Sequence, residues 1–588
     1  MISSSPPVTI PDVSITDFVL RHAARLGDKP ALIDGPTGRT LSYRQLAEGA
    51  RRTAAGLARR GFAKGQVLAI YCPNLPEYAV VFLGVAMAGG VNTTVNPLYT
   101  ADELANQLND SGARFLVTVP PFLDKARQAA AKSKVEEIFV IGAADGARPF
   151  SELLQAGDTP PAVTIDPAQD LVALPYSSGT TGLPKGVMLT HRNLVANLRQ
   201  CEGMRNFECF GEGDITMAVL PFFHIYGMVV IMMLGLAGGG TILVMPRFDM
   251  MEFLTLVQQY RVTILPLVPP IVLGLVKHPA VAQFDLSSVR LVFSGAAPLG
   301  EEMARALSAK LHCPVVQGYG MTEASPVTHL SPTHDAPFKP GSAGCIVPST
   351  EVKIVDVSGT SAEELPVGKE GELWIRGPQI MRGYLNRPAE TADCLDREGW
   401  YHTGDVGYVD DDGFFFIVDR TKELIKYKGM QVAPAELEAL LLTHPAILDA
   451  AVVRKADEEA GEVPKAYVVL KPDEASKAAS ADAIMGWVAQ RVAPHKRIRH
   501  LEFIDQIPKS ASGCSRMSPG IASRTRLRLS VFHALNTVST KSALPRRASA
   551  MISIVRSWVP MGVSRGSNGR SSSRPSGLAI VSMPSGIG

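Results

Sequence analysis

The chain has 588 residues, of which 46% are hydrophobic, and its Lys and Arg outnumber its Asp and Glu by two. This length is too great for one ordinary hydrophobic core, so at least two domains are expected. The near-neutral charge excludes a strong overall electrostatic preference for nucleic acids or anionic membranes, and the hydrophobic content is typical of a soluble globular protein.

The cysteines and the two ends of the chain indicate its compartment. Seven cysteines are scattered without a CxxC pair, which argues against a disulfide framework or a zinc site. The first residues, MISSSPPVTIPDVS, lack the basic and apolar regions of a signal peptide. The last four, SGIG, are no peroxisomal tripeptide. We therefore expect a cytoplasmic protein, and the sequence leaves its oligomeric state open.

From about residue 40 to residue 350, short apolar runs alternate with helical stretches. The runs VLAIYC, RFLVTV, EEIFVIG, VTILPLV and VRLVFSG read as strands, and EYAVVFLGVAMAGG reads as a helix. This alternation predicts an α/β fold with mostly parallel sheets. The apolar stretch 227–246 is long enough to span a membrane. Three glycines at 238–240 divide it, however, so we predict a buried helix–turn–strand and no transmembrane segment.

Residues 176–186, YSSGTTGLPKG, combine hydroxyl groups, glycines and a lysine. The preceding DLVALP is strand-like, and THRNLVANLRQ has helical spacing that opens on Thr190. Backbone N–H groups, hydroxyls and an ammonium in this order can surround polyphosphate oxygens. The usual P-loop pattern fails, because Gly186 follows Lys185. An ordinary turn with a solvated lysine is the alternative. The candidate phosphate ligands are Ser177, Ser178, Gly179, Thr180, Thr181, Gly182 and Lys185.

The run PFFHIYGM at 221–228 places His224 among aromatic residues. A histidine in such surroundings is more often part of the core than a catalytic base, so we assign His224 a positioning role.

Two loops follow predicted strands at the end where open α/β sheets bind ligands, namely GAAPLG at 295–300 and QGYGMTEAS at 317–325. A loop of small residues lets a nucleotide base lie against backbone, and Tyr319 can stack on the base. Thr322 offers a hydroxyl to phosphate, and Glu323 offers Mg²⁺ the hard carboxylate that it prefers. Taken singly, each residue would more often belong to a turn. The candidates in these loops are Gly295, Ala296, Ala297, Gln317, Gly318, Tyr319, Gly320, Met321, Thr322 and Glu323.

From about residue 350 the segments become β-rich, with a hairpin turn predicted at the DDDG of 410–413. Beyond Asp419 and Arg420 come two helical runs and two strands, a compact α+β unit the size of a small domain. From Cys514 the texture changes again: residues 514–588 contain eleven Lys or Arg and no Asp or Glu. We therefore predict domains at 1–419 and 420–513, followed by a basic Ser/Arg-rich tail at 514–588.

In order and approximate spacing, the motifs above, with YHTGD at 401–405 and DRTKELIKYKG at 419–429, resemble those of the acyl-adenylate-forming (AMP-binding) enzymes. The resemblance covers about residues 15–513. It looks closest to 4-coumarate–CoA ligases and to medium- and long-chain fatty acyl-CoA synthetases. It implies a large N-terminal α/β domain with a β-rich subdomain, a small mobile α+β C-terminal domain, and the use of ATP, Mg²⁺ and coenzyme A.

The resemblance also implies roles for individual residues. By this resemblance the catalytic candidates are Lys185, Thr322, Glu323 and His224, and Glu323 is the expected metal ligand. Asp405 matches an aspartate that accepts hydrogen bonds from both ribose hydroxyls, a task suited to an acceptor-only carboxylate. A solvated basic loop would explain Lys428 equally well from charge alone. The residues expected to contact the nucleotide or to line the AMP or CoA side are Arg420, Lys426, Lys428, Gly429 and Gln431.

The sequence departs from the resemblance at one point. The family's C-terminal domain ends in a loop similar to PKSASGKILRR, whose lysine bridges the α-phosphate and the attacking carboxylate. Here residues 508–513 read PKSASG, and Cys514 follows. The acid-free tail that begins there looks like translation in a shifted frame or an adventitious disordered extension, and a divergent genuine tail is the alternative. Since a cation on developing charge typically contributes about 10²–10³ in rate, we expect slow adenylation.

The sequence therefore predicts an ATP-dependent carboxylic acid–CoA ligase that forms an acyl-AMP and then an acyl-CoA thioester. Its partners would be a small-molecule carboxylic acid, either aryl or fatty, with ATP and CoA, and no nucleic acid. A module that loads a carrier protein, a luciferase-like oxygenase and a nucleotide-binding pseudoenzyme remain open.

Overall fold

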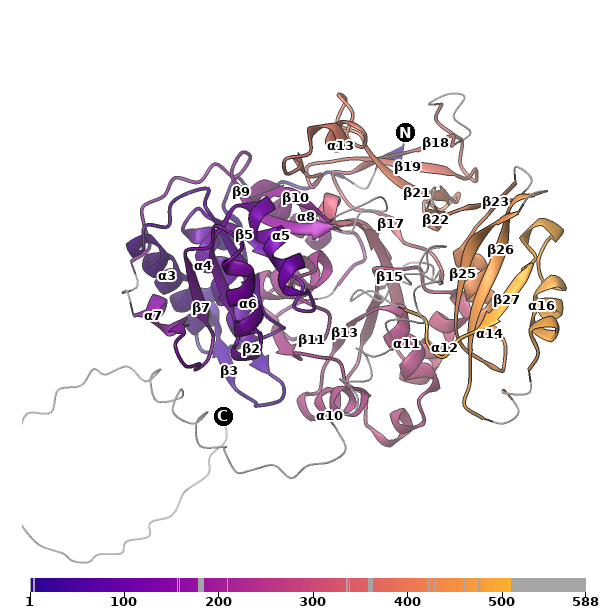
Figure 1. Ribbon diagram of the computed structural model, residues 1–588, viewed down its shortest axis with the longest axis horizontal. Coiled ribbons are helices and arrows are strands. Elements are labelled where there is room, and N and C mark those ends of the chain that lie inside the picture. The colour runs from indigo at the N-terminus through magenta and orange to yellow at the C-terminus, as the bar shows by residue number, and fades with distance from the viewer. Residues whose placement is uncertain are drawn as a thin grey trace, which may run out of the picture. The chain divides into compact units, whose positions relative to one another are not determined.

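The computed structural model describes residues 2–3, 6–155, 157, 159–177, 184–208, 210–334, 337, 339–357, 363–420, 423–427, 430–457, 460–473, 476 and 479–508. Four β-sheets and their helices make up this part of the chain (Figure 1). Several predicted features lie outside the described residues: Ser178, Gly179, Thr180, Thr181, Gly182, Lys428, Gly429 and the tail from Cys514.

An eight-stranded sheet carries the strands on either side of the predicted phosphate loop. Most neighbouring strands are parallel, namely the pairs β9–β5, β5–β4, β4–β6, β6–β7 and β7–β8. Strand β10 pairs antiparallel with both β9 and β20. The strand order is β20 (Gly383–Tyr384), β10 (Lys185–Thr190), β9 (Leu171–Ser177), β5 (Val91–Thr94), β4 (Val67–Tyr71), β6 (Ala113–Thr118), β7 (Glu137–Val140) and β8 (Arg148–Pro149).

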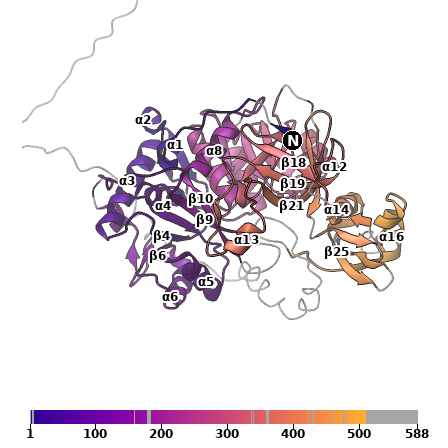
Figure 2. The same ribbon diagram turned by 90° about the horizontal axis from the view of Figure 1, so that it is seen from above.

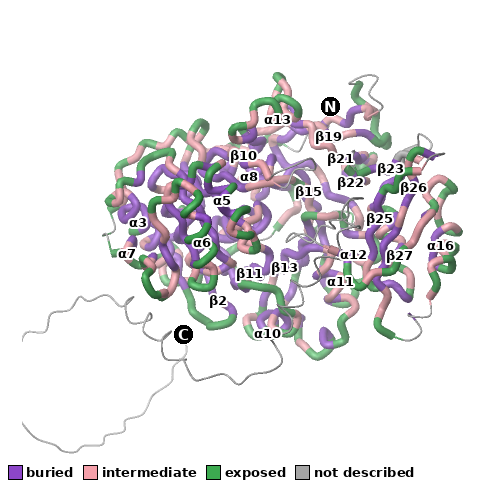
Figure 3. The backbone as a smooth tube through the Cα atoms, viewed as in Figure 1, coloured by how far each residue is buried: buried purple, intermediate pink, exposed green. Residues whose placement is uncertain are grey.

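Helices cover both faces of this sheet, so β4 is buried along its whole length. Val67, Ala69 and Tyr71 pack with α5 and α6, whereas Leu68 and Ile70 face the larger cluster that contains α3 and α4. Figure 2 shows these two helix pairs on opposite sides of β4 and β6. Exposed residues gather on the outer turns of helices such as α6 (Figure 3). The helices are α3 (Tyr43–Arg59), α4 (Pro76–Met87), α5 (Ala101–Ser111), α6 (Leu123–Ala130) and the short α7 (Ser151–Leu154).

A nine-stranded sheet forms the second half of the large α/β region. Its central strands are parallel and lie in the order β2, β12, β11, β13, β14 and β15. The antiparallel pairs lie at the two edges of the sheet. The strand order is β17 (Cys345–Ile346), β16 (Val327–Leu330), β15 (Val315–Gly320), β14 (Leu291–Ser294), β13 (Ile264–Leu267), β11 (Ile215–Ala218), β12 (Thr241–Val244), β2 (Pro30–Asp34) and β3 (Thr40–Ser42). The predicted α/β fold with mostly parallel sheets is therefore confirmed.

Further helices connect or flank these strands. The helix predicted after the phosphate loop is α8, and Thr190 caps it in a reciprocal capping box with Asn193. The elements are α1 (Ile15–Val19), α2 (Ala23–Leu26), α8 (His191–Glu202), α10 (Met250–Tyr260), α11 (Pro269–Lys277), α12 (Glu301–Leu311), η1 (Pro120–Phe122) and η3 (Pro279–Gln283).

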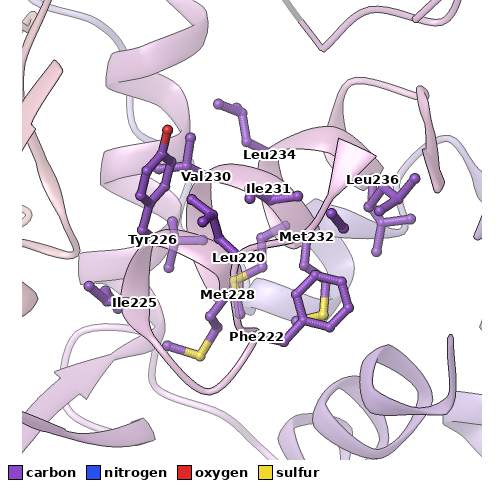
Figure 4. Close-up of a cluster of buried hydrophobic side chains, with 14 of the residues drawn as sticks. Leu220, Phe222, Ile225, Tyr226, Met228, Val230, Ile231, Met232, Leu234 and Leu236 are labelled. Carbon is purple, nitrogen blue, oxygen red and sulfur yellow. The ribbon is translucent and has the colours of Figure 1, made fainter. Parts of the chain in front are cut away.

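The apolar stretch 227–246 forms the predicted buried helix–turn–strand. The π-helix η2 (Tyr226–Met233) and α9 (Leu234–Ala237) precede the glycines, and β12 follows them. All η2 residues are buried, and their side chains gather with Leu220 and Phe222 (Figure 4). Among the described residues, no helix is both long and apolar enough to cross a membrane.

The β-rich segments form a five-stranded antiparallel sheet. The predicted hairpin turn at DDDG joins β21 to β22, and Gly413 adopts a φ of 81°, which favours glycine. The strand order is β1 (Ile2–Ser3), β18 (Glu351–Val355), β19 (Gly371–Arg376), β21 (Tyr401–Val409) and β22 (Phe415–Arg420).

Beyond Arg420, a smaller sheet has its own hydrophobic cluster, formed with α14 and α16. Its strands pair antiparallel except β27, which runs parallel to β26. The elements are β23 (Ile425–Tyr427), β24 (Met430–Val432), α14 (Pro434–Thr443), β25 (Ile447–Asp457), β26 (Gly461–Leu470), α16 (Ala481–Ala489), η5 (Pro494–Lys496) and β27 (His500–Phe503).

Candidate active site

The predicted phosphate loop connects two antiparallel strands. Ser177 ends β9 and lies opposite Lys185, the first residue of β10. Strand β10 was not predicted from the sequence, because it lies between the glycine-rich loop and the strong helix signal of α8. The Tyr176 hydroxyl donates a 2.8 Å hydrogen bond to Oδ2 of Asp110, at the end of α5. The base of the loop is therefore tied to the helix layer.

Tyr384, which was not among the predicted site residues, contacts both Lys185 and Glu323. The Nζ atom of Lys185 lies 4.9 Å from the ring centroid of Tyr384. The Tyr384 hydroxyl in turn donates a 2.8 Å hydrogen bond to Oε1 of Glu323. Glu323 is buried within the 3₁₀ turn η4 (Thr322–Ala324), and its carbonyl accepts a hydrogen bond from the N–H of Met381.

The loops after β14 and β15 meet at one edge of the nine-stranded sheet, since these strands are parallel and Ser294 pairs with Gln317. The Gln317 amide both accepts from and donates to the backbone of Leu299, so it ties the two loops together. Gly320 approaches its neighbours so closely that a Cβ atom there would lie 2.0 Å from the Pro326 carbonyl oxygen. Met321 and Thr322 follow at this edge, both half-buried.

The small-residue loop at 295–297 lies against the segment that contains His224. A Cβ atom on Gly295 would lie 3.0 Å from the Tyr226 ring, whose hydroxyl donates to the Phe293 carbonyl at 3.0 Å. Ala296 adopts a φ of 68°, which is uncommon for a residue with a Cβ atom. The structure therefore brings two motifs together that are about 70 residues apart in sequence.

His224 has the geometry of a neutral imidazole. Its Nδ1 atom accepts a hydrogen bond from the Tyr226 N–H at 3.3 Å. Burial lowers the pKa of His224 to about 4, so the ring carries no charge near neutral pH.

Asp405 lies at the centre of a network drawn from three motifs. The Tyr319 hydroxyl donates a 2.6 Å hydrogen bond to its Oδ2, and Nε of Arg420 donates to its Oδ1 at 3.2 Å. Arg420 faces it because the two residues pair across β21 and β22. Burial raises the pKa of Asp405, although Arg420 and the Tyr319 hydroxyl act in the opposite direction. The Tyr319 ring also approaches the buried His329 ring.

The segment after Asp405 leads into the smaller sheet. The Asp419 carboxylate accepts hydrogen bonds from the Arg420 N–H at 2.7 Å and from the Ala435 N–H at 3.1 Å. It therefore fastens the end of β22 to the first turn of α14. In the hairpin beyond, Lys426 of β23 pairs with Gln431 of β24.

Two comparisons of sequence identify the chain. A family model described as "AMP-binding enzyme" matches residues 19–385. A second model, described as "AMP-binding enzyme C-terminal domain", matches residues 436–513. The chain belongs to the AMP-binding enzyme family. Relatives that match most of the chain include acid–CoA ligases. A 4-coumarate–CoA ligase from Pinus taeda is 46% identical over 520 residues, which cover 86% of this chain and 95% of that protein.

Solved structures give the same result for this AMP-binding enzyme. The anthranilate CoA ligase AuaEII in complex with anthranoyl-AMP has a TM-score of 0.79 at 25% identity, covering 88% of this chain and 98% of that one. ATP-bound MatB from Rhodopseudomonas palustris has a TM-score of 0.77 at 28% identity, covering 88% and 99%. The fold predicted from the family resemblance is thus confirmed.

Proposed function

We propose that this chain is an ATP-dependent carboxylic acid–CoA ligase that works through an acyl-adenylate. In the first half-reaction the carboxylate of the acid attacks the α-phosphorus of ATP, and the bond to pyrophosphate breaks. In the second, the thiol of CoA loses its proton, its sulfur attacks the acyl carbon, and AMP leaves. The observation that carries this proposal is the Asp405 carboxylate between Tyr319 and Arg420, in a chain 46% identical to a 4-coumarate–CoA ligase.

Asp405 is suited to hold the ribose of the nucleotide. A carboxylate accepts hydrogen bonds but donates none, so it can serve two adjacent ribose hydroxyls. Arg420 offers charge to the nucleotide from the same place, because its side chain is about half exposed beside Asp405. The base would lie against Gly295, Ala296 and Ala297, with Gln317, Gly318, Gly320 and Met321 shaping the neighbouring loop.

Lys185 and the hydroxyl-rich loop would hold the triphosphate, and Thr322 would add a hydroxyl. Glu323 fits Mg²⁺, because only Oε1 accepts a hydrogen bond from a described residue and Oε2 is left as a hard oxygen donor. No cluster of three His, Cys, Asp or Glu side chains suited to a metal occurs in the described ranges. A single carboxylate agrees with Mg²⁺, which relies on phosphate oxygens and water. The ion would neutralise phosphate charge.

The acid would bind beside His224 and Tyr226, where a neutral imidazole orients but does not take a proton. The substrate's own carboxylate is ionised at neutral pH and needs no base. Apolar walls suit aryl and alkyl chains alike. The names of the relatives, which include 4-coumarate and anthranilate ligases, favour an aryl acid over a fatty acid.

The C-terminal unit would supply the second half-reaction. In this proposal domain 1–419 binds the nucleotide, and domain 420–513 rotates about Asp419 and Arg420. The rotation would complete the catalytic site between the two half-reactions, as domain closure does in other enzymes. The residues that would line the AMP-binding or CoA-binding side of the active site are Lys426, Lys428, Gly429 and Gln431. A cytoplasmic location agrees with this use of ATP and CoA.

Adenylation by this chain would be slow, because Cys514 stands where the family resemblance has a lysine. Single-turnover measurements of acyl-AMP formation and of CoA transfer onto supplied acyl-AMP test this directly, with a panel of aromatic and fatty acids as substrates. Adenylation at the full rate of a lysine-containing relative would refute the impairment. Absence of any CoA-dependent AMP release with every acid would refute the ligase.

A nucleotide-binding pseudoenzyme is the second candidate, and Cys514 is again the observation that favours it. Such a protein would keep the Asp405 and Lys185 sites but lack turnover. Isothermal titration that finds ATP affinity, together with no AMP release, would support this candidate.

A further inference from the structure

Tyr384 connects the loop lysine to the acidic residue. It is 8% exposed, and its ring and its hydroxyl meet different partners: the Lys185 ammonium lies over the ring, and the hydroxyl donates to Glu323. We propose that Tyr384 is a positioning residue that holds the Glu323 carboxylate for Mg²⁺ and the Lys185 ammonium for phosphate. This inference rests on the function proposed above.

The backbone of Tyr384 is held on both sides. It pairs with Val187 of β10, and the next N–H, that of Leu385, donates to the Gly186 carbonyl at 2.8 Å. The Tyr384 N–H donates to Oγ1 of Thr391, in α13 (Pro388–Ala392), at 2.9 Å. The ring therefore keeps a defined place beside the strand that begins at Lys185.

The ring and the hydroxyl have separate effects. An ammonium over the face of a tyrosine is attracted by about 0.5–2 kcal/mol, depending on how far it is desolvated. Burial, and next the charge of Glu323, raises the pKa of Tyr384 far above its ordinary value, so the phenol remains a donor at every physiological pH. A phenol that donates to Oε1 restricts rotation of the carboxylate and leaves Oε2 as the site for a cation.

A hydrogen bond to a metal-binding carboxylate affects metal affinity by a typical amount. Loss of such an outer contact typically weakens metal affinity or activity by about 10- to 100-fold. We therefore expect Tyr384→Phe, which keeps the ring, to weaken Mg²⁺-dependent ATP binding by about 10-fold or more. ATP binding without Mg²⁺ should be unchanged, because Lys185 keeps its ring. Tyr384→Leu should weaken ATP binding both with and without Mg²⁺.

The experiment is isothermal titration of the full chain with ATP, once in EDTA and once over a series of MgCl₂ concentrations. Tyr78→Phe is the matched control, because the buried Tyr78 hydroxyl has no hydrogen-bond partner among the described residues. That variant should bind ATP as the wild type does. A thermal melt of each variant confirms that it folds.

A double-mutant cycle tests whether the hydroxyl acts through the carboxylate. In a Glu323→Gln background, Tyr384→Phe should have little further effect on the Mg²⁺ dependence. Equal Mg²⁺ dependence in the wild type and Tyr384→Phe would overturn the inference while leaving the ligase proposal intact, as would an additive cycle. A wild-type chain without ATP affinity would instead overturn the proposed function, and the inference with it.

Discussion

The hydroxyl of Tyr319 lies 2.6 Å from Oδ2 of Asp405, although 86 residues separate them in sequence. Tyr319 is the penultimate residue of β15 in the nine-stranded sheet, and Asp405 lies in β21 of the five-stranded sheet. The bond orients the carboxylate, and the Tyr319 ring packs beside the ring of His329, with 5.5 Å between the ring centroids. The bond therefore joins the base-binding and ribose-binding parts of the proposed nucleotide site.

Asp405→Asn should weaken ATP binding without loss of stability. Asparagine is uncharged and replaces one of the two acceptor oxygens with a donor, so it loses the charged hydrogen bonds that a carboxylate can accept from the ribose hydroxyls. We expect affinity to fall by about 10-fold or more, since a hydrogen bond to a charged group is worth about 1.5–3 kcal/mol. Burial of the charge opposes folding, so the melting temperature should stay level or rise. Calorimetry and thermal unfolding check both. Undiminished ATP affinity would contradict the ribose role.

Lys185→Gln should slow acyl-AMP formation. The substitution keeps the polarity and most of the length of the side chain but removes the charge proposed to face the triphosphate, and about 10²-fold in rate is expected from the loss of such a cation. Single-turnover pyrophosphate release measures it. Lys132→Gln serves as the control, because Lys132 pairs with Asp102 on the exposed surface and should have no effect. Similar rates for both variants would argue against a phosphate-binding loop.

Cys514→Lys should restore adenylation if the cation alone is missing. We expect acyl-AMP formation to rise by about 10²-fold, the usual contribution of a charge placed on a transition state. CoA transfer onto supplied acyl-AMP should change little. Cys514→Ser controls for loss of the thiol. An unchanged rate in the lysine variant would mean that the sequence after residue 514 prevents the loop from reaching the site.

Glu438 should make stability fall as pH rises toward neutrality. Its Oε1 accepts a 2.8 Å hydrogen bond from the Val452 N–H, and burial raises its pKa from 4.5 to about 7. The folded chain therefore binds this proton more tightly than the unfolded chain. The stability that the proton provides is complete below about pH 4.5 and is lost as pH rises through 7.

Glu438→Gln removes this titration and keeps an acceptor for Val452. Each pKa unit corresponds to about 1.4 kcal/mol, so the variant should be more stable than the wild type by about 3 kcal/mol at pH 8 and by less than about 1 kcal/mol at pH 5. Thermal melts across pH 5–8 measure the difference. Glu436→Gln, on the exposed side of the same helix, keeps Glu438 and should therefore follow the pH dependence of the wild type. Parallel curves for Glu438→Gln and the wild type would contradict the prediction.

Local patterns predicted much of the fold. The strand VLAIYC became β4, the glycines at 238–240 divided the apolar stretch as expected, and Thr190 capped α8. These features depend on neighbouring residues, through backbone conformation, capping and the alternation of apolar side chains. Strand β10 was missed because it lies between the glycine-rich loop and the helix signal of α8, and its second pairing partner, β20, lies about 200 residues away.

Short contiguous runs of residues were enough to predict the family, the α/β architecture and the candidate motifs, because each of these depends on residues close together in the chain. Which of the motif side chains contact one another could be seen only in the folded chain. Asp405 faces Arg420 through the register of one hairpin, and Tyr384, 61 residues from Glu323, meets it because a two-residue strand pairs beside β10. Such contacts depend on strand order and register across whole sheets, and no local pattern encodes them.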